Sequence, residues 1–372
     1  MSEWKKVKLG DIANIRTGKL DSNAAVPNGL YPFFTCDPNT LRINNWAYDT
    51  EAVLLAGNNA SGNYTAKYYH GKFNAYQRTY IIESSNTDIT STRFLAFAMN
   101  LQLRQLKVMS SGSTTKFITM KMLTGLDIPQ PNIKTQLHIA TILSRYDSLI
   151  ENYQKQIKLL EEAAQRLYKE WFIDLRFPGH ENTKIVDGVP EGWEKKRLVG
   201  LVDVQYGYAF DGKLFNSNGE GMPILRIRNI PDGITSDYTT EEAQDCYIVH
   251  NGDIVVGMDG IFHINSWSAG DAYLVQRACS FRPKVEEMKG FIFQAIQEPI
   301  KFFEKTLVGA TVAHLGKKHI DSIELCIPRS MELYGPFTKQ YEQRQKLLSQ
   351  IRLLTEARDR LLPKLMSGEI AV

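Results

Sequence analysis

A pair of polar residues, Gln-Arg, occurs at matching positions in the two halves of this 372-residue sequence, as Gln77-Arg78 and as Gln276-Arg277. An arginine side chain can form a two-point contact with guanine, and a glutamine side chain can do the same with adenine. These four residues are therefore candidates for direct contact with DNA bases. The structural alternative stays open, because an arginine that belongs to an internal ion pair would also recur wherever the fold recurs.

Loops rich in small polar residues also occur at matching positions. One loop covers residues 57–62 and its counterpart begins at Gly257; a further pair is 111–116 with 308–314. Asparagine suits adenine, while lysines and backbone amides hold phosphates. Such loops are also ordinary turns. The further candidates for DNA contact are Asn58, Asn59, Lys116 and Lys317.

The sequence lacks the common patterns of catalytic and metal sites. Gly57 and Gly62 have the glycine spacing of a phosphate-binding loop, but Asn63-Tyr64 stands where that loop needs lysine and serine or threonine. The seven histidines form no H-E-x-x-H pair, and the four cysteines form no C-x-x-C pair. No glycine-rich or Asn-Pro-Pro-Tyr-like motif for S-adenosylmethionine is found. We expect no catalytic residue, metal or cofactor in this chain.

The composition indicates an ordinary globular protein, with 43% hydrophobic and 23% charged residues. The start of the chain is too polar for a signal peptide and no apolar run is long enough to cross a membrane, so a cytoplasmic location is expected. Residues 1–133 carry 14 Lys+Arg and 9 Asp+Glu, whereas residues 176–338 carry 17 and 22. If both domains bind DNA, the second must do so through a local basic face, because its overall charge is unfavourable.

A twelve-residue segment occurs twice, as Gln156–Leu167 and as Gln350–Leu361, with eight identical positions. Each half also opens on a similar segment, which begins at Trp4 and at Trp193. A repeat of roughly 190 residues is too long for a solenoid unit. It predicts two modules, each a domain followed by a helix, related by a pseudo-twofold axis. Such a protein suits a partner with two similar half-sites.

The repeated segments belong to two predicted long helices, about Lys134 to Trp171 and about Lys339 to Ser367. Their apolar residues recur alternately every four and three positions, which is the period of a coiled-coil seam. The second helix begins where the second domain ends, so a helix that packs on the first must run antiparallel to it. Arg358 occupies a seam position, where it either reaches solvent by its alkyl stem or sets the register. The seam residues of the first helix are Ile139, Leu143, Tyr146, Ile150, Tyr153, Ile157, Leu160, Ala164, Leu167 and Trp171.

Short runs of strand-forming residues, Ala52–Leu55, Thr79–Ile82, Pro223–Arg228 and Asp253–Val256, alternate with turns and with a helical stretch at Thr92–Met99. The predicted fold class is α+β, with two similar domains separated by a long antiparallel two-helix coiled coil. The predicted segments are a first domain at 1–133, a helix at 134–177, a linker at 178–192, a second domain at 193–338 and a helix at 339–372.

This order of segments resembles the specificity subunit of type I restriction-modification enzymes over essentially the whole chain. The matching stretches are the two openings, the run Gly71–Tyr80, the two helix segments and the tail Leu361–Ile370. The resemblance implies two target-recognition domains that bind a split double-stranded DNA target, one half-site each. It also implies assembly with methyltransferase subunits, of which two are expected, and with restriction-translocase subunits. S-adenosylmethionine, ATP and magnesium would belong to those partners.

Two other functions stay open. The chain could be the recognition module of a self-contained restriction-methylation enzyme, which the missing methyl-donor and nuclease motifs disfavour. It could also be a coiled-coil scaffold whose domains bind protein or glycan. A mobility-shift assay on random duplex DNA, with and without a partner methyltransferase, separates these functions because a scaffold would shift nothing.

Overall fold

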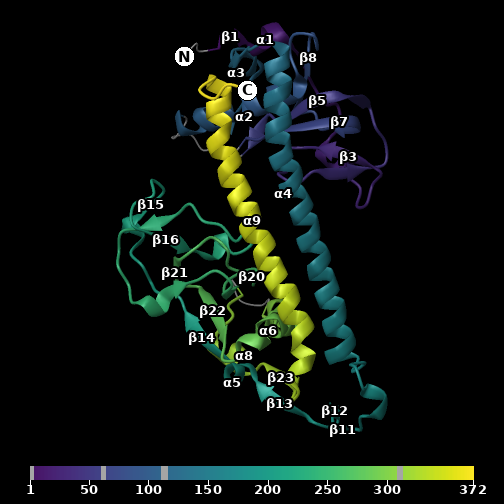
Figure 1. Ribbon diagram of the computed structural model, residues 1–372, viewed down its shortest axis with the longest axis vertical. Helices are drawn as coiled ribbons and strands as arrows, with labels where there is room; N and C mark the ends of the chain where they lie inside the picture. The colour runs from purple at the N-terminus through teal and green to yellow at the C-terminus, as the bar shows by residue number, and fades with distance from the viewer. Residues whose placement is uncertain (1–3, 60–63, 110–115, 308–312) are drawn as a thin grey trace. The chain divides into compact units, whose positions relative to one another are not determined.

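The computed structural model describes residues 4–59, 64–109, 116–307 and 313–372, without the side chains of 59, 104–109 and 116 (Figure 1). The chain forms two compact units. The first consists of Met1–Leu149 with Leu354–Val372, and the second of Ile150–Leu353. Each unit combines one α+β domain with parts of two long helices, α4 (Ile133–Tyr168) and α9 (Gly335–Ser367).

The domain of the first unit is built on a six-stranded sheet in the order β2-β8-β5-β7-β3-β4. The run Ala52–Leu55 lies in its central strand β5 (Tyr48–Ala56), as predicted, and is buried throughout. Alternate residues of this run face opposite sides of the sheet. Val53 packs with helix α2 (Thr92–Met109), and Leu54 packs with an aromatic cluster. The other elements of this domain are β1 Lys6–Lys8, α1 Leu9–Ile12, β2 Ala13–Thr17, β3 Tyr31–Phe34, β4 Leu41–Ile43, β6 Asn58–Asn59, β7 Ala66–Ala75, β8 Thr79–Ser84, β9 Lys116–Phe117, α3 Met120–Thr124 and β10 Asp127–Pro129.

The domain of the second unit repeats this plan with two smaller sheets, β14-β22-β19-β20 and β15-β17-β16-β21-β18. Its strand β19 (Ile254–Gly257) is again buried on both faces. Ile254 packs in the main core with helix α6 (Lys289–Ala295), whereas Val255 packs in a separate cluster around Trp267. The other elements are β11 Ile185–Val186, β12 Val189–Pro190, β13 Trp193–Arg197, α5 Leu198–Leu201, β14 Val202–Tyr206, β15 Phe215–Asn216, β16 Met222–Leu225, β17 Tyr238–Thr239, β18 Ile248–Val249, β20 Ile264–Ser266, β21 Ala272–Leu274, β22 Ala278–Pro283, α7 Gln297–Thr306, α8 Lys317–Asp321 and β23 Glu324–Pro328.

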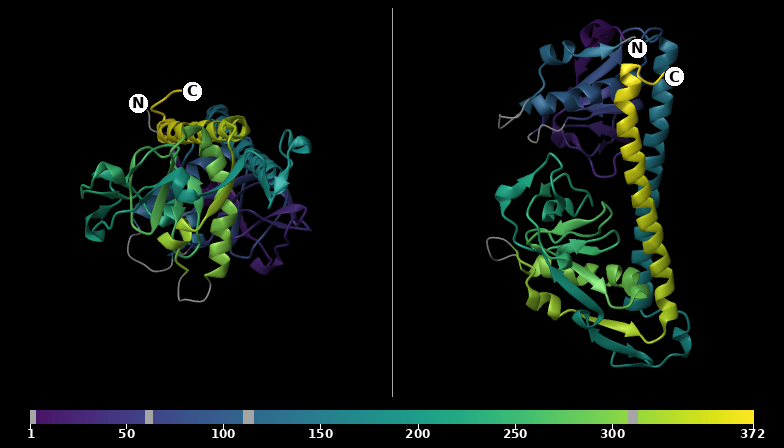
Figure 2. Two further views of the ribbon diagram at one scale, coloured as in Figure 1. Left: turned by 90° about the horizontal axis from the view of Figure 1, so that it is seen from below. Right: turned by 60° about the vertical axis from the view of Figure 1, so that its left-hand side comes forward.

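In each domain, the strand of the opening segment pairs with the last strand in a two-stranded sheet. In the first unit β1 pairs antiparallel with β10, and in the second β13 pairs antiparallel with β23. The segment before β1 lies beside the end of α9 in both ribbon views (Figures 1 and 2). There the Trp4 indole nitrogen donates to the Leu365 carbonyl oxygen at 3.4 Å. The similar openings of the two halves thus have the same structural role.

The helices α4 and α9 run antiparallel in their contacts within each unit. In the first unit the Arg358 Nη1 donates to Asp147 Oδ1 at 2.7 Å, and in the second the Arg344 Nε donates to Glu161 Oε1 at 2.6 Å. Residues 147 and 161 are 14 apart on α4, and residues 358 and 344 are 14 apart in the opposite direction on α9. The predicted orientation is therefore confirmed, and Arg358 fixes the register of the two helices. All ten predicted seam residues of the first helix are buried or half-buried.

Two boundaries predicted from the sequence are wrong. The strand predicted over Pro223–Arg228 ends at Leu225, because the Asn229 side chain accepts from the Arg226 amide at 3.0 Å and turns the chain. The second long helix begins at Gly335, four residues before the predicted start at Lys339. The first helix passes into a single π-helical turn, Lys169–Ile173, before it ends.

Candidate nucleic-acid interface

In the first domain, Gln77 and Arg78 form the turn between β7 and β8, and both side chains are exposed. The backbone of this turn is fixed by hydrogen bonds. The Gln77 amide donates to the Leu20 carbonyl at 2.8 Å, and the Gly57 amide donates to the Arg78 carbonyl at 2.8 Å. Within the described residues, no hydrogen bond or ion pair engages the Arg78 guanidinium. The turn therefore fixes the backbone of Arg78, while its guanidinium has no partner in the part of the chain that the structure describes.

In the second domain, Gln276 and Arg277 form the same turn between β21 and β22, again with exposed side chains. The Gln276 amide donates to the Tyr208 carbonyl at 2.8 Å, and the Met258 amide donates to the Arg277 carbonyl at 2.8 Å. The two hydrogen bonds are equivalent to those of the first domain. The sequence match between the two Gln-Arg pairs thus reflects one repeated pattern of backbone hydrogen bonds.

A glycine makes each turn possible. A Cβ atom added to Gly18 would lie 2.2 Å from the Ala75 carbonyl oxygen, and one added to Gly207 would lie 2.2 Å from the Val275 carbonyl oxygen. Both distances are far below a van der Waals contact, so only glycine fits at these positions. These glycines let the strand that follows the domain opening approach the Gln-Arg turn.

A second segment borders each turn. In the first domain, Asn58 pairs with Phe117 across the short strands β6 and β9, and the Ile118 amide donates to the Gly57 carbonyl at 2.9 Å. In the second domain, Asp259 forms an isolated antiparallel bridge with His314. Three chain segments therefore meet at the same end of each domain.

The side chains of this second-domain site form an ion-paired cluster. Asp259 Oδ2 lies 3.2 Å from Arg277 Nη1, and Asp259 Oδ1 lies 2.6 Å from His314 Nδ1. The Asp259 side chain is 18% exposed, whereas those of Arg277 and His314 are 67% and 58% exposed. The internal ion pair, left open as an alternative from the sequence, thus exists in the second domain. It leaves most of the Arg277 side chain accessible.

The other four residues predicted to contact DNA lie in different environments. Asn58 is half-buried in β6, next to the Gln77-Arg78 turn. The side chains of Asn59 and Lys116 lie outside the described part of the chain, although their backbones pair across β6 and β9. Lys317 is exposed at the start of α8, where its Nζ lies 3.0 Å from Asp321 Oδ2. The loops predicted at 57–62, 111–116 and 308–314 fall largely on undescribed residues.

Tyrosines near the first-domain site are packing residues. The Tyr80 hydroxyl donates to the Ile118 carbonyl at 2.8 Å, and burial raises its pKa, so it remains a neutral donor that secures the segment after β9. The Tyr68 hydroxyl donates to Glu51 at 2.8 Å; burial and this hydrogen bond raise the pKa of Tyr68 to about 12. Tyr69 packs on Phe34, with ring centroids 5.4 Å apart.

The described residues contain neither a metal cluster nor a membrane-spanning helix. Within the described ranges, no group of three or more histidine, cysteine, aspartate or glutamate side chains is placed to hold a metal ion. Nor does any described helix have the length and apolar character needed to span a membrane. Burial raises the pKa of the Cys279 thiol, which lies within the second-domain core, so this cysteine remains a neutral packing residue.

Two residues of the site were missed from the sequence, Asp259 and His314. Aligning the loops by their first glycines pairs Gly57 with Gly257. The Gly57 amide donates to the Arg78 carbonyl and the Met258 amide donates to the Arg277 carbonyl, so Gly57 is equivalent to Met258. Asp259 is therefore the counterpart of Asn58. A one-residue shift in the loop alignment, anchored on the Gln-Arg pairs, would have revealed this match.

Two similar α+β domains, each presenting the same polar turn, together with two antiparallel helices define a duplicated binding protein. The family model described as type I restriction modification DNA specificity domain matches residues 1–162 and 190–350. The chain therefore belongs to the specificity subunits of type I restriction-modification systems.

Individual relatives agree with this membership. The chain is 33% identical over 225 residues to the type I restriction enzyme EcoDI specificity subunit of Escherichia coli, a match that covers 54% of this chain and 49% of that subunit. It thus spans about half the length of that relative. It is 24% identical over 406 residues to the MjaVIII specificity subunit of Methanocaldococcus jannaschii, covering 100% of this chain and 93% of the other. The crystal structure of the type I S subunit from M. genitalium is similar in fold, with a TM-score of 0.59 and 18% identity over 97% of this chain and 96% of the other.

Proposed function

We propose that this chain reads a split DNA target, with one half-site bound by each recognition domain. The observation that carries this proposal is the repeated turn: both domains present an exposed Gln-Arg pair in the same hydrogen-bonded frame. Guanidinium and carboxamide groups suit the edges of guanine and adenine in the major groove of double-stranded DNA. The flanking residues differ between the domains, Asn58 and Phe117 against Asp259 and His314, so the two half-sites should differ in sequence.

The helices α4 and α9 would set the number of unspecified base pairs between the half-sites. This part of the proposal is supported by the two ion pairs that fix their register, Asp147 with Arg358 and Glu161 with Arg344. A helix pair that cannot slide is suited to hold two domains at a constant spacing.

Two methyltransferase subunits would dock at equivalent grooves, one in each unit. The groove of the first unit has a volume of about 250 Å³ and that of the second about 610 Å³. Two wall positions correspond in the repeat. Phe172 and Met366 each lie five residues after the end of a repeated helix segment, and Ala98 and Ala295 lie in the domain helices α2 and α6. Exposed apolar Phe302 lines the larger groove and is available to a protein partner.

The chain itself would be non-catalytic, in a cytoplasmic complex whose methyltransferase and restriction-translocase subunits hold S-adenosylmethionine, ATP and magnesium. This part rests on the sequence, which lacks a methyl-donor or nucleotide motif. Purified chain incubated with labelled S-adenosylmethionine and duplex DNA should transfer no methyl group. Multiple turnover without a partner would contradict the proposal.

The central experiment is selection of bound sequences from a random duplex pool, with the chain alone and with its methyltransferase subunits. We expect two short conserved blocks separated by a constant gap. One contiguous block would contradict a split target. No enrichment by the assembled complex would favour the scaffold function.

A further inference from the structure

We propose that Asp259 is a positioning residue that aligns the Arg277 guanidinium with a guanine in the second half-site, while His314 holds Asp259 from its other side. This inference rests on the proposed DNA reading. It adds two specificity-determining residues to that function and assigns a base to one position of the target.

The two contacts of Asp259 restrict the direction of the Arg277 guanidinium. Asp259 uses one oxygen for Arg277 at 3.2 Å and the other for His314 at 2.6 Å, so its carboxylate cannot rotate without breaking a contact. The guanidinium nitrogen in this ion pair with the carboxylate is Nη1, and the Arg277 side chain is 67% exposed. A guanidinium carries five N–H donors and a two-point contact with guanine needs two of them, so an exposed Arg277 that meets one carboxylate retains enough donors for that contact.

The backbone of Arg277 supports a local function. Its φ is 72°, in the left-handed region that residues other than glycine rarely adopt. The equivalent turn residue Arg78 does not have a positive φ, so the repeated frame does not require this conformation. Strained residues occur where the surrounding structure holds a side chain in a particular direction. Here that direction brings the Arg277 side chain to Asp259.

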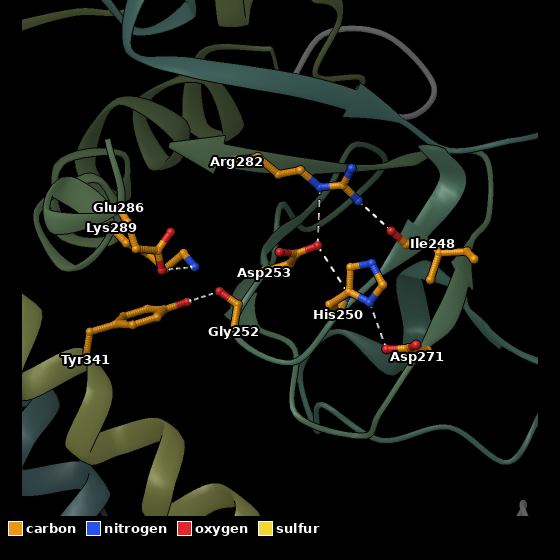
Figure 3. A network of polar contacts seen from close by, with 9 residues as sticks. All are labelled: Ile248, His250, Gly252, Asp253, Asp271, Arg282, Glu286, Lys289 and Tyr341. Carbon is orange, nitrogen blue, oxygen red and sulfur yellow. Dashed lines mark hydrogen bonds and ion pairs between the residues drawn. The ribbon is translucent and has the colours of Figure 1, made fainter. Parts of the chain in front are cut away.

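Asp259 itself is carried by a rigid support. It lies in the loop between β19 and β20, and helix α9 holds the other end of these strands. The Tyr341 hydroxyl donates to the Gly252 carbonyl at 2.9 Å just before β19, a contact visible in Figure 3. Arg344 Nη2 donates to Asn265 Oδ1 at 2.8 Å in β20. Burial raises the pKa of Tyr341, so this hydroxyl stays a neutral donor.

Further contacts hold the same region from its sides. Asp253 lies 3.3 Å from Arg282 and accepts from the His250 amide at 3.1 Å (Figure 3). The Phe262 amide donates to Glu304 Oε2 at 2.7 Å, which ties the loop to helix α7. The loop that bears Asp259 is therefore fixed on both sides, as the alignment of a base contact requires.

The first domain provides the contrast. Asn58 is the counterpart of Asp259, Phe117 is the counterpart of His314, and Arg78 has no partner among the described residues. An unpaired arginine can adopt several rotamers, so the first half-site should tolerate more variation at the corresponding base. The second domain carries excess negative charge and depends more on an aligned contact than on general attraction.

The test compares four variants in the complete complex with methyltransferase subunits: Asp259→Ala, Asp259→Asn, Arg277→Ala and the double variant Asp259→Ala with Arg277→Ala. Selection from a random duplex pool gives the base preference at every position. We expect Asp259→Ala to reduce the preference for guanine at one position of the second half-site by about tenfold, the size of a lost two-point contact. Asp259→Asn, which retains an acceptor for Arg277, should lose less. The first half-site should not change.

The double variant separates alignment from a direct base contact. If Asp259 acts through Arg277, the double variant should show the same preference as Arg277→Ala. Additive losses, or an Asp259→Ala variant with wild-type preference, would overturn the inference while Arg277 remained a base contact. If Arg277→Ala changes no base preference, the proposed role of the Gln-Arg turn fails as well. Thermal unfolding of each purified variant identifies loss of folding, and Asp259→Asn, which preserves shape, keeps the test valid if the alanine variant unfolds.

Discussion

At the scale of single residues, the two Gln-Arg turns combine a conserved frame with different surroundings. Their backbones make the same two hydrogen bonds, whereas Asn58 and Phe117 border the first turn and Asp259 and His314 border the second. In the proposed function, the shared frame would present a side chain to the DNA and the neighbouring residues would select the base, so that one fold could read two different half-sites.

Arg78→Ala and Arg277→Ala should each impair one half-site and leave the other intact. Loss of a two-point contact costs about 1–3 kcal/mol of discrimination. Methylome sequencing of cells that contain each variant with its partner subunits measures this effect. A variant that unfolds, or that no longer assembles with the methyltransferase, would instead assign the arginine a structural role.

Gly207→Ala should destabilise the second unit, because the added methyl group would lie 2.2 Å from the Val275 carbonyl oxygen. Overpacking against backbone costs about 1–3 kcal/mol. Gly212→Ala is the matched control, since nothing lies within 4 Å of its added Cβ. Denaturant unfolding of both variants gives the comparison. Equal stability of the two would show that the approach of the strand to the turn is not constrained.

At the scale of elements, the helices were more predictable than the site. The heptad pattern predicted the seam of α4, because burial of a periodic apolar stripe is a local property of sequence, and the order of domains and helices predicted the antiparallel direction of α9. The strand over Pro223–Arg228 was overextended because a single side chain, Asn229, captures the Arg226 amide. Asp259 was missed because its partners, Arg277 and His314, come from distant segments that only the fold brings together.

Arg344→Ala should destabilise the second unit by about 1–3 kcal/mol, the cost of leaving buried polar groups without their hydrogen-bond partner. Arg344 is almost fully buried and contacts Glu161, Asn265 and Ser266, so its removal leaves three polar groups without their donor. Lys346→Ala, at an exposed position of the same helix, should change the free energy of unfolding by less than about 0.5 kcal/mol. Similar effects of the two substitutions would show that Arg344 does not secure the helix to the domain.

At the scale of the whole molecule, the duplication includes both the Gln-Arg turns and the grooves proposed for the partners. Phe302→Asp should weaken binding of one methyltransferase subunit, because it places a charge on the apolar wall of the larger groove. Phe302 is 61% exposed, so the folded chain should tolerate the change. Native mass spectrometry of the complex should show one methyltransferase subunit in place of two. An unchanged complex would locate the docking surface elsewhere.

Lengthening both helices tests whether they set the gap between half-sites. The ion-pair register places residue 154 of α4 opposite residue 351 of α9, so seven residues inserted after Gln154 and after Gln350 keep the seam and both ion pairs in phase. The added heptads lengthen the pair by roughly 10 Å at ~1.5 Å per residue. Since DNA rises about 3.4 Å per base pair, the gap should grow by about three base pairs while both half-sites keep their sequences.

The insertion also rotates one half-site relative to the other, because about 10 base pairs make one turn of DNA. Binding should therefore weaken even at the new gap. A seven-residue insertion in α4 alone is the control; it shifts one helix against the other and should abolish assembly, since Asp147 and Glu161 can no longer both meet their arginines. Methylome sequencing measures the gap directly. An unchanged gap in a folded, active complex would show that a feature other than the helix length sets the spacing.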